Sequence, residues 1–375
     1  MNVVIMVSDG YPLKFSANNS KGEFIAMGLK EAGCKVSMID SPLGTNGIQE
    51  LKSGVSENGI PYYILPKNCF WKNIKTIWRV LKETKEPEKN HLLLGMSYLP
   101  IYLVTVTIAM ILGYKRSTLF HEWHISMKYS NMAFQIEAWL RDKCFGYFLN
   151  LIFPISHFLE GKCSPFGKKT FLLPVLASYE RKANLELSPK HFTYCGHAGY
   201  LLRNTLLLDA FKLLIEDTSN QEISLQLVLV GNSEQLDDVN KMITTYGLTS
   251  CVSIKSQLPQ SELYKIYDSS IGLIIPLDPS SLQDTARFSQ KIAEYVASKR
   301  PIITNSVGEI PYYFKHMESA VIVPYDAMGF YSGMDVLLKN KQLSDEIGLN
   351  GFVVGMNSFN YKVVGRKVKE IMESL

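Results

Sequence analysis

The sequence predicts an α/β protein with two domains, each built around a parallel β-sheet crossed by helices. Three observations lead to this prediction. The chain has 375 residues, which is long for one domain and comfortable for two. Short apolar runs alternate with helical patterns, as they do in strand–helix–strand units. The alternation restarts after Pro174, beyond a polar and charged stretch at 178–190 that fits a linker.

Five apolar runs in the first half predict strands. They are Val3–Val7, Lys35–Ile39, Tyr62–Leu65, Leu92–Met96 and Thr118–His121. Between the first two runs, Ser20–Gly33 carries apolar residues at helical spacing and stops at a glycine, so the first crossover helix is expected there.

The segment from Leu92 to Tyr114 contains no charged residue, which is long enough to suggest a membrane span. Gly95 and Pro100 interrupt it. We therefore expect a buried strand followed by a helix over Ile101–Leu112, with a lipid-contacting helix or a true span as the alternatives.

Six runs in the second half predict a second sheet. They are Phe192–Cys195, Leu225–Val230, Val252–Ile254, Gly272–Ile275, Ile302–Thr304 and Val321–Val323. The tail Tyr361–Leu375 has a helical apolar stripe. The expected organisation is one domain over 1–180, a second over 181–358, and a terminal helix over 359–375 with the option of crossing back to the first domain.

Composition excludes several classes of protein. The formal charge is +4, from 39 Lys and Arg against 35 Asp and Glu, which is too small an excess for a general nucleic-acid binder. The six cysteines include no CxxC pair, so they predict reduced core residues and not a metal site. The N-terminus lacks a basic region and a cleavage site, so we expect a strand there and a cytoplasmic protein.

The segment around residue 290 carries the clearest chemical signal. Ser289 is a good helix N-cap, Gln290–Ser298 favour a helix, and Pro301 blocks its continuation. The first N–H groups of such a helix suit a diphosphate. Lys291 in the first turn suits a nearby anion, and Glu294 is placed to accept hydrogen bonds from ribose hydroxyls. The alternative is an ordinary solvated helix face.

This segment resembles the donor-binding motif of the retaining GT-B glycosyltransferases of family 4. That motif has a Glu, seven residues, a second Glu, small residues, a Gly, any residue, a Pro and a strand. Glu294, Ala297 and Pro301 match its second half, and Phe288 matches an aromatic position between the two Glu residues. In the family, the second Glu binds the ribose and the first contacts the donor sugar.

The sequence departs from the motif in two places. The first Glu falls on Ala286, and the Gly falls on Lys299. A branch of the family with a Lys-x-x-Glu-Tyr pattern also lacks the first Glu, and Lys291 and Tyr295 fit that branch. The resemblance therefore supports a ribose contact by Glu294 more strongly than a contact with the donor sugar.

Other positions are assigned by the same resemblance. Arg203 lies where the family usually has a phosphate-binding Lys, and a second basic position falls on Ala198. Leu227–Gly231 resembles the nucleotide-side strand. The residues expected to bind the donor are Arg203, Gly231, Ser289, Gln290, Lys291 and Glu294, and Arg203, Lys291 and Glu294 are also expected to serve catalysis. Cations and helix N–H groups would stabilise the leaving diphosphate.

His121 is expected to complete the catalytic set from the first domain. It ends a predicted strand, where residues of such sheets project into a ligand site, and the family often has a His near the donor sugar there. The alternative is a polar strand end in solvent. There is no Gly-x-Ser-x-Gly elbow, no metal-ligand spacing and no Asp-x-Asp clamp. We expect no metal and no cofactor beyond the nucleotide sugar, which is a substrate. The resemblance implies retention of anomeric configuration.

The segment Phe70–Glu83 predicts a helix that touches a membrane. Trp71, Ile74, Trp78 and Leu81 are expected on one face, beside a stripe of Lys72, Lys75, Arg79 and Lys82. A basic amphipathic helix with Trp at its boundary is typical of a membrane-surface helix. The alternative is a packing helix with solvated lysines.

Together these patterns predict a glycosyltransferase that acts on a lipid-linked or polysaccharide-precursor acceptor at the cytoplasmic membrane face. One alternative is a catalytically silent subunit of the same fold, because the first Glu and a second basic residue are missing. A two-domain solute-binding receptor is a further alternative, but the export signal that it would need is not present.

Overall fold

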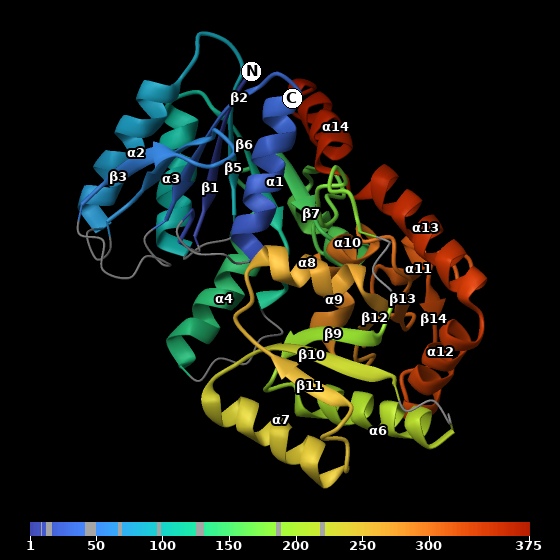
Figure 1. Ribbon diagram of the computed structural model, residues 1–375. Helices are drawn as coiled ribbons and strands as arrows, with labels where there is room; N and C mark the ends of the chain where they lie inside the picture. Colours follow the sequence, from blue (N-terminus) through green and yellow to red (C-terminus); the bar gives the residue numbers. More distant parts are fainter. Residues whose placement is uncertain are drawn as a thin grey trace. The chain divides into compact units, whose positions relative to one another are not determined.

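The computed structural model describes residues 1–8, 10–12, 17–41, 50–66, 70–95, 99–124, 131–184, 189–217 and 222–375. The chain forms two compact units (Figure 1). Unit 1 contains Met1–Ala177, Ala286–Phe288 and Ser358–Leu375. Unit 2 contains Ser178–Thr285 and Ser289–Asn357.

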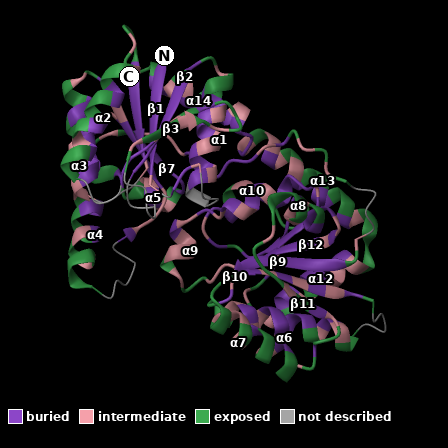
Figure 2. Cartoon of the chain, turned by 60° about the vertical axis from the view of Figure 1, so that its left-hand side comes forward, coloured by how far each residue is buried: buried purple, intermediate pink, exposed green. Residues whose placement is uncertain are grey.

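Unit 1 is built around an eight-stranded sheet in the order β3-β4-β2-β1-β5-β6-β7-β8. Its strands are β1 (Asn2–Val7), β2 (Lys35–Asp40), β3 (Lys52–Val55), β4 (Pro61–Ile64), β5 (Asn90–Leu94), β6 (Lys115–Phe120), β7 (Leu151–Pro154) and β8 (Lys169–Thr170). All neighbouring strands run parallel except β3 and β4, which form an antiparallel pair at one edge. The central strand β1 is buried along its whole length (Figure 2), as expected for a sheet covered on both faces.

Helices cover the two faces of this sheet. They are α1 (Ala17–Glu31), α2 (Phe70–Thr84), α3 (Leu99–Ile111), α4 (Met132–Cys144), the short α5 (His157–Gly161) and α14 (Tyr361–Glu373). The C-terminal helix α14 packs on α1, so the chain ends in the unit where it began (Figure 1). α3 packs against α2 and is hydrogen-bonded to the α4 segment, because Leu99 N donates to Glu137 Oε1 at 2.9 Å and Tyr102 Oη donates to Phe145 O at 3.1 Å.

Unit 2 has a six-stranded parallel sheet in the order β11-β10-β9-β12-β13-β14. Its strands are β9 (His191–His197), β10 (Ser224–Val230), β11 (Val252–Lys255), β12 (Ser270–Ile275), β13 (Ile302–Thr304) and β14 (Val321–Ile322). Its helices are α6 (Leu201–Asp217), α7 (Ser233–Thr245), α8 (Gln260–Asp268), α9 (Leu282–Ala286), α10 (Gln290–Val296), α11 (Ile310–Tyr313), α12 (Ala327–Lys339) and α13 (Lys341–Ser358).

The predicted strands are all present, with ends within three residues of the expected ones. The strand expected to reach Met96 ends at Leu94, and Met96 lies outside the described residues. The uncharged stretch divides into buried β5 and the 13-residue helix α3, as expected. Among the described residues, none of the helices combines the length and hydropathy needed to cross a membrane.

Two expectations need correction. The helix expected to run to Ser298 ends at Val296, and Ala297 serves as its C-cap. The single apolar face expected on α2 is divided, because Leu81 is fully buried while Trp71 is 77% exposed. A helix lying on a sheet must bury part of its circumference, and α2 buries Ile77, Val80 and Leu81.

Candidate active site

In unit 2, the guanidinium of Arg203 is held in the first turn of α6. It forms an ion pair with Asp284 and lies over the ring of Tyr200, 4.5 Å from the ring centroid. Asp284 also accepts a hydrogen bond of 2.8 Å from the backbone N–H of Asp278. The carboxylate therefore ties the loop at 278–284 to α6, and it places a fixed cation beside that loop. Asp284 had not been singled out from the sequence, because nothing in its local pattern indicates which distant cation it meets.

The short helix α10 carries the central residues of the donor motif. Ser289 occupies the N-cap position with extended backbone, but its side chain accepts no capping hydrogen bond in the described structure. Gln290 is buried, whereas Lys291 and Glu294 are partly buried. Burial raises the pKa of Glu294 to about 7, although Lys291 and Gln290 both favour its charged form. Such a carboxylate has unused capacity to accept hydrogen bonds from a ligand.

Tyr264 on α8 lies near this carboxylate. Burial raises the pKa of its phenol, and the charge of Glu294 raises it further. The Arg181 guanidinium lies 4.6 Å from the Tyr264 ring centroid. An aromatic ring beside Glu294 is a suitable surface for a nucleoside base.

Gly231 has a packing reason to be glycine. It follows β10 directly, and a Cβ atom there would lie 2.9 Å from the Ala198 side chain and 3.0 Å from Gln235 Oε1. The next residue, Asn232, caps α7 in a reciprocal capping box with Gln235. The turn thus brings the end of β10 close to Ala198, where a larger residue at 231 would not fit.

The residue at the first Glu position of the motif belongs to unit 1. Ala286 is fully buried, and its carbonyl accepts a hydrogen bond of 2.6 Å from Ser156 Oγ. Two residues on, the rings of Phe288 and Phe359 pack edge to face with centroids 5.4 Å apart. The packing around position 286 therefore accommodates a small apolar residue and does not present a carboxylate.

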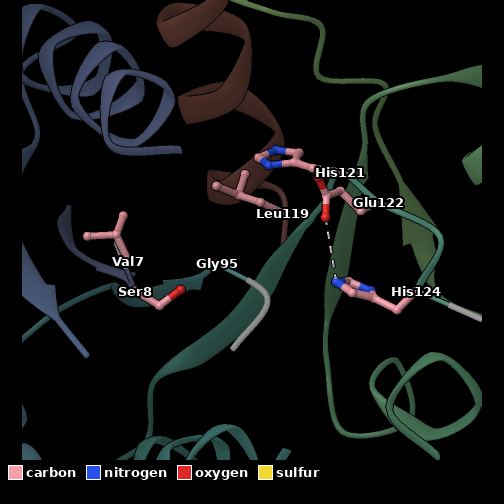
Figure 3. Close-up of a pocket in the computed structure, with 7 residues that line it drawn as sticks. All are labelled: Val7, Ser8, Gly95, Leu119, His121, Glu122 and His124. Atoms are coloured by element: carbon pink, nitrogen blue, oxygen red, sulfur yellow. Dashed lines mark ion pairs between the residues drawn. The ribbon is translucent and has the colours of Figure 1, made fainter. Parts of the chain in front are cut away.

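In unit 1, a pocket of about 60 Å³ lies at the carboxyl ends of β1, β5 and β6 (Figure 3). It is lined by Val7, Ser8, Gly95, Leu119, His121, Glu122 and His124. His121 follows β6 directly, as expected for a strand-end residue. Burial lowers the pKa of His121 well below its ordinary value, and the charge of Lys21 lowers it further, so the imidazole is neutral at pH 7.

A second histidine of this pocket is held by a carboxylate. His124 Nδ1 lies 3.1 Å from Asp142 Oδ1, and both side chains are buried. Its Nε2 lies 4.0 Å from Glu122 Oε2 (Figure 3). A carboxylate on one ring nitrogen fixes the ring orientation and leaves the other nitrogen free for a partner. Asp142 comes from α4, which was not predicted, so this pair was not foreseen.

Charged groups gather around Glu122. Arg287 Nη2 lies 2.9 Å from Glu122 Oε1. Lys21 on α1 is nearly fully buried, and this burial lowers its pKa to about 7 although the charge of Glu122 opposes the shift. Arg287 and a lysine that is partly neutral at pH 7 thus lie near Glu122, which lines the pocket, and this arrangement suits a substrate with polar or negative groups.

The expected site residues fall into two groups. Arg203, Gly231 and the Ser289–Glu294 segment belong to unit 2, and His121 belongs to unit 1. Among the described residues, no three His, Cys, Asp or Glu side chains are placed to hold a metal ion. The expectation that the reaction needs no metal stays a prediction.

Several solved structures have the same fold. Sucrose-phosphate synthase from Thermosynechococcus elongatus matches with a TM-score of 0.73 and 13% identity, over 100% of this chain and 98% of the other. Anabaena HepE in complex with UDP-glucose matches with a TM-score of 0.72 and 12% identity, over 100% of both chains. The α,α-trehalose-phosphate synthase from Burkholderia xenovorans, in complex with glucose-6-phosphate, matches with a TM-score of 0.71 and 11% identity, over 99% of both chains.

The two parallel-sheet units and these matches show that the chain has the GT-B fold. Residues 178–353 match the family described as glycosyl transferases group 1, so the chain carries the group 1 domain in its second unit. Among curated protein sequences, none matches this chain. The expected GT-B fold is thereby confirmed for the chain, and the expected family likeness is confirmed for residues 178–353.

Proposed function

We propose that this glycosyltransferase transfers a sugar from a nucleotide-diphosphate donor to a lipid-linked or polysaccharide-precursor acceptor, with retention of configuration and without a metal ion. The observation that carries the donor side is Glu294, a partly buried carboxylate beside Lys291 and Tyr264 within a group 1 domain. HepE in complex with UDP-glucose has the same fold, and UDP is therefore the first nucleotide to test.

Each donor contact follows from the chemistry of its side chain. Glu294 accepts hydrogen bonds from the ribose hydroxyls, which removes part of the cost of burying its charge. Arg203 and Lys291 bind the diphosphate and stabilise the charge that develops when the sugar leaves. The Asp284 carboxylate holds Arg203 in a fixed position before the donor arrives, which lowers the entropy lost on binding.

On the acceptor side, His121 contacts the reacting sugar as a neutral group. A neutral imidazole donates or accepts one hydrogen bond without adding charge to the pocket. In this proposal configuration is retained without a protein nucleophile, and an oxygen of the departing diphosphate accepts the proton of the acceptor hydroxyl.

A catalytically silent subunit is the second candidate function. It is favoured by the buried Ala286 at the position of the first Glu, because no carboxylate reaches the donor sugar from there. Turnover or hydrolysis of a nucleotide sugar by the purified chain separates the two proposals.

The donor site is tested by nucleotide binding to Arg203→Ala and Lys291→Ala, measured by calorimetry. Loss of a charge-assisted contact of about 1.5–3 kcal/mol weakens UDP binding about 10- to 150-fold. Uridine, which lacks the phosphates, should bind within about twofold of wild type. Lys212→Ala on the same helix as Arg203 is the matched control, since Lys212 is an exposed cation. Equal losses of affinity for UDP and for uridine would show that Arg203 and Lys291 do not bind the phosphates.

The lipid-linked acceptor is supported by α2. Its two tryptophans, Trp71 and Trp78, are 77% and 38% exposed. All four cations of the helix, Lys72, Lys75, Arg79 and Lys82, are exposed as well. Exposed Trp beside exposed cations is the arrangement that binds an anionic membrane surface, and it holds the protein at the cytoplasmic face where such acceptors lie.

A further inference from the structure

Helix α4 of unit 1 presents an apolar face to solvent. Its large apolar residues are Met132, Phe134, Ile136, Trp139 and Leu140, which are 73%, 54%, 53%, 50% and 39% exposed. Met132, Ile136, Trp139 and Leu140 recur at the spacing of one helix face, and we call these four residues the α4 face. In Figure 2, exposed residues run along much of this helix.

The inward side of α4 contains two charged residues beside the small apolar Ala138, which differs from the usual arrangement. Arg141 and Asp142 are buried, and Arg141 lies 3.6 Å from Glu137 while Asp142 holds His124. Surface helices of proteins in water normally bury apolar residues and expose charged ones. The helix buries Arg141 and Asp142 and exposes its large apolar residues, although Lys143 in its last turn is exposed too. This pattern indicates that something other than water covers the outer face.

The neighbouring helices show the chemistry of that covering partner. α3, which lies next to α4, contains no charged residue, and its end exposes Met110 and Ile111 by 49% and 64%. α2 lies next to α3 and carries the four exposed cations. Across the three helices the carboxylates are Glu83, Glu137 and Asp142, of which Glu83 alone is exposed, and it lies 4.0 Å from Arg79.

We propose that the α4 face inserts into the boundary between headgroups and acyl chains of an anionic bilayer, while the cations of α2 bind the headgroups. The charge pattern favours a bilayer over a second copy of the chain. A two-fold contact uses the same surface on both copies, so it would bring two surfaces with an excess of exposed cations together. Trp139 suits the boundary because its ring is apolar and its N–H is polar.

This inference deepens the proposed function and rests on it in one respect, that the acceptor is a lipid held in the same bilayer.

The experiment uses the purified full-length chain and vesicles of neutral lipid, with or without about a third of anionic lipid. Binding is measured by co-sedimentation for wild type, Ile136→Gln/Trp139→Gln/Leu140→Gln, and Lys72→Gln/Lys75→Gln/Arg79→Gln/Lys82→Gln. Leu349→Gln/Val353→Gln in unit 2 is the matched control, because these apolar residues are 48% and 55% exposed.

The α4 variant should bind anionic vesicles at least about tenfold more weakly, because it removes apolar area that the membrane would bury. The α2 variant should lose the preference for anionic vesicles. The control should bind as wild type does. Wild-type binding by the α4 variant would overturn the proposal. The proposal would also be overturned if light scattering showed that the wild type is a dimer and that the α4 substitutions convert it to a monomer, because a second copy would then cover the α4 face.

Two further measurements keep folding and function separate. A chain with Trp71, Trp78 and Trp123 replaced by Phe leaves Trp139 as its one tryptophan, and brominated lipids should quench that fluorescence. Absence of quenching would contradict insertion even if the Gln variants misfold. Thermal stabilisation by UDP is recorded for each protein. If wild type binds vesicles but not UDP, the donor proposal fails and the membrane face stands; the reverse result removes only the membrane face.

Discussion

Glu294 is a carboxylate in a place that disfavours its charge. Burial raises its pKa from 4.5 to about 7, so the native state holds a proton more tightly than the unfolded chain does. The free energy of unfolding therefore decreases as the pH rises from about 4.5 to about 7. Such partial destabilisation is typical of a residue kept for binding and not for stability.

We predict that Glu294→Gln is more stable than wild type at pH 8 but not at pH 4. The difference should be about 1–3 kcal/mol, which is less than the full shift implies because the side chain is only partly buried. Urea denaturation at both pH values measures it. If the variant lost stability equally at the two pH values, the buried charge of Glu294 would not be what destabilises the wild-type protein above its pKa.

The same residue predicts a pH dependence of donor binding. The ionised carboxylate accepts ribose hydrogen bonds more strongly than the protonated one, so wild-type affinity for uridine should increase from pH 6 to pH 8. Glu294→Gln should show no such increase and should bind more weakly at pH 8. Glu346→Gln, on an exposed site of α13, should behave as wild type does. Calorimetry with uridine excludes titration of the UDP phosphates, and a parallel pH response in the Gln variant would contradict the assignment.

His121 is predicted to affect turnover more than donor binding. It lies in the unit 1 pocket and is neutral at pH 7, so its contacts should matter most when charge develops in the transition state. His121→Ala should lower kcat by about tenfold or more and leave the Kd for UDP within about twofold. His157→Ala, an exposed histidine of the same unit, is the control. Weakened UDP binding with normal turnover would place His121 at the nucleotide instead.

At the scale of elements, the contact between α1 and α14 depends on two glycines. A Cβ atom on Gly28 would lie 2.3 Å from the Tyr361 carbonyl oxygen and 3.1 Å from Gly365 Cα. Glycines at this crossing let the two helix backbones approach closely, and so the last helix of the chain can cover the first one. The sequence gives the apolar stripe of α14 but not the helix on which it packs.

We predict that Gly28→Ala destabilises the protein by about 1–3 kcal/mol, because the methyl group forces α14 away from α1. Alanine is favoured over glycine within a helix by about 1 kcal/mol, which offsets part of this cost. Gly161→Ala is the control, since a Cβ atom there meets nothing within 4 Å. Denaturant unfolding measures both variants, and a stabilised Gly28→Ala would show that the crossing tolerates a larger separation.

At the scale of the whole molecule, the division into two units predicts which backbone amides a bound nucleotide protects from hydrogen exchange. UDP at about 100 times its Kd should stabilise the protein by about 2.7 kcal/mol. Hydrogen exchange should slow chiefly in the unit 2 peptides that contain Arg203 and residues 289–294, with little change at His121–His124. Mass spectrometry of exchanged peptides tests this, and protection centred on the unit 1 pocket would mean that the donor is bound by the other unit.

The local sequence determined much of the fold. Apolar runs such as Val3–Val7 and Ile302–Thr304 fixed the strands, because a strand buried in a parallel sheet must be apolar along its length. Ser289 and Pro301 predicted a helix between them from local chemistry, and α10 begins after Ser289, although it ends at Val296 and Ser289 makes no side-chain capping hydrogen bond. The Glu294 prediction came from the resemblance of its register to the family's donor-binding motif, since the local pattern alone also fits a solvated helix face.

The tertiary structure alone decided which distant groups meet. Arg203 pairs with Asp284, His124 with Asp142, and Gly28 packs by Gly365, at separations along the chain that no periodicity reveals. The reversed face of α4 escaped prediction for a related reason. An apolar stripe predicts a helix face but not whether that face is buried. The direction of the face also depends on the partners of the charged residues on the other side of the helix, and Arg141 and Asp142 have such partners in the interior.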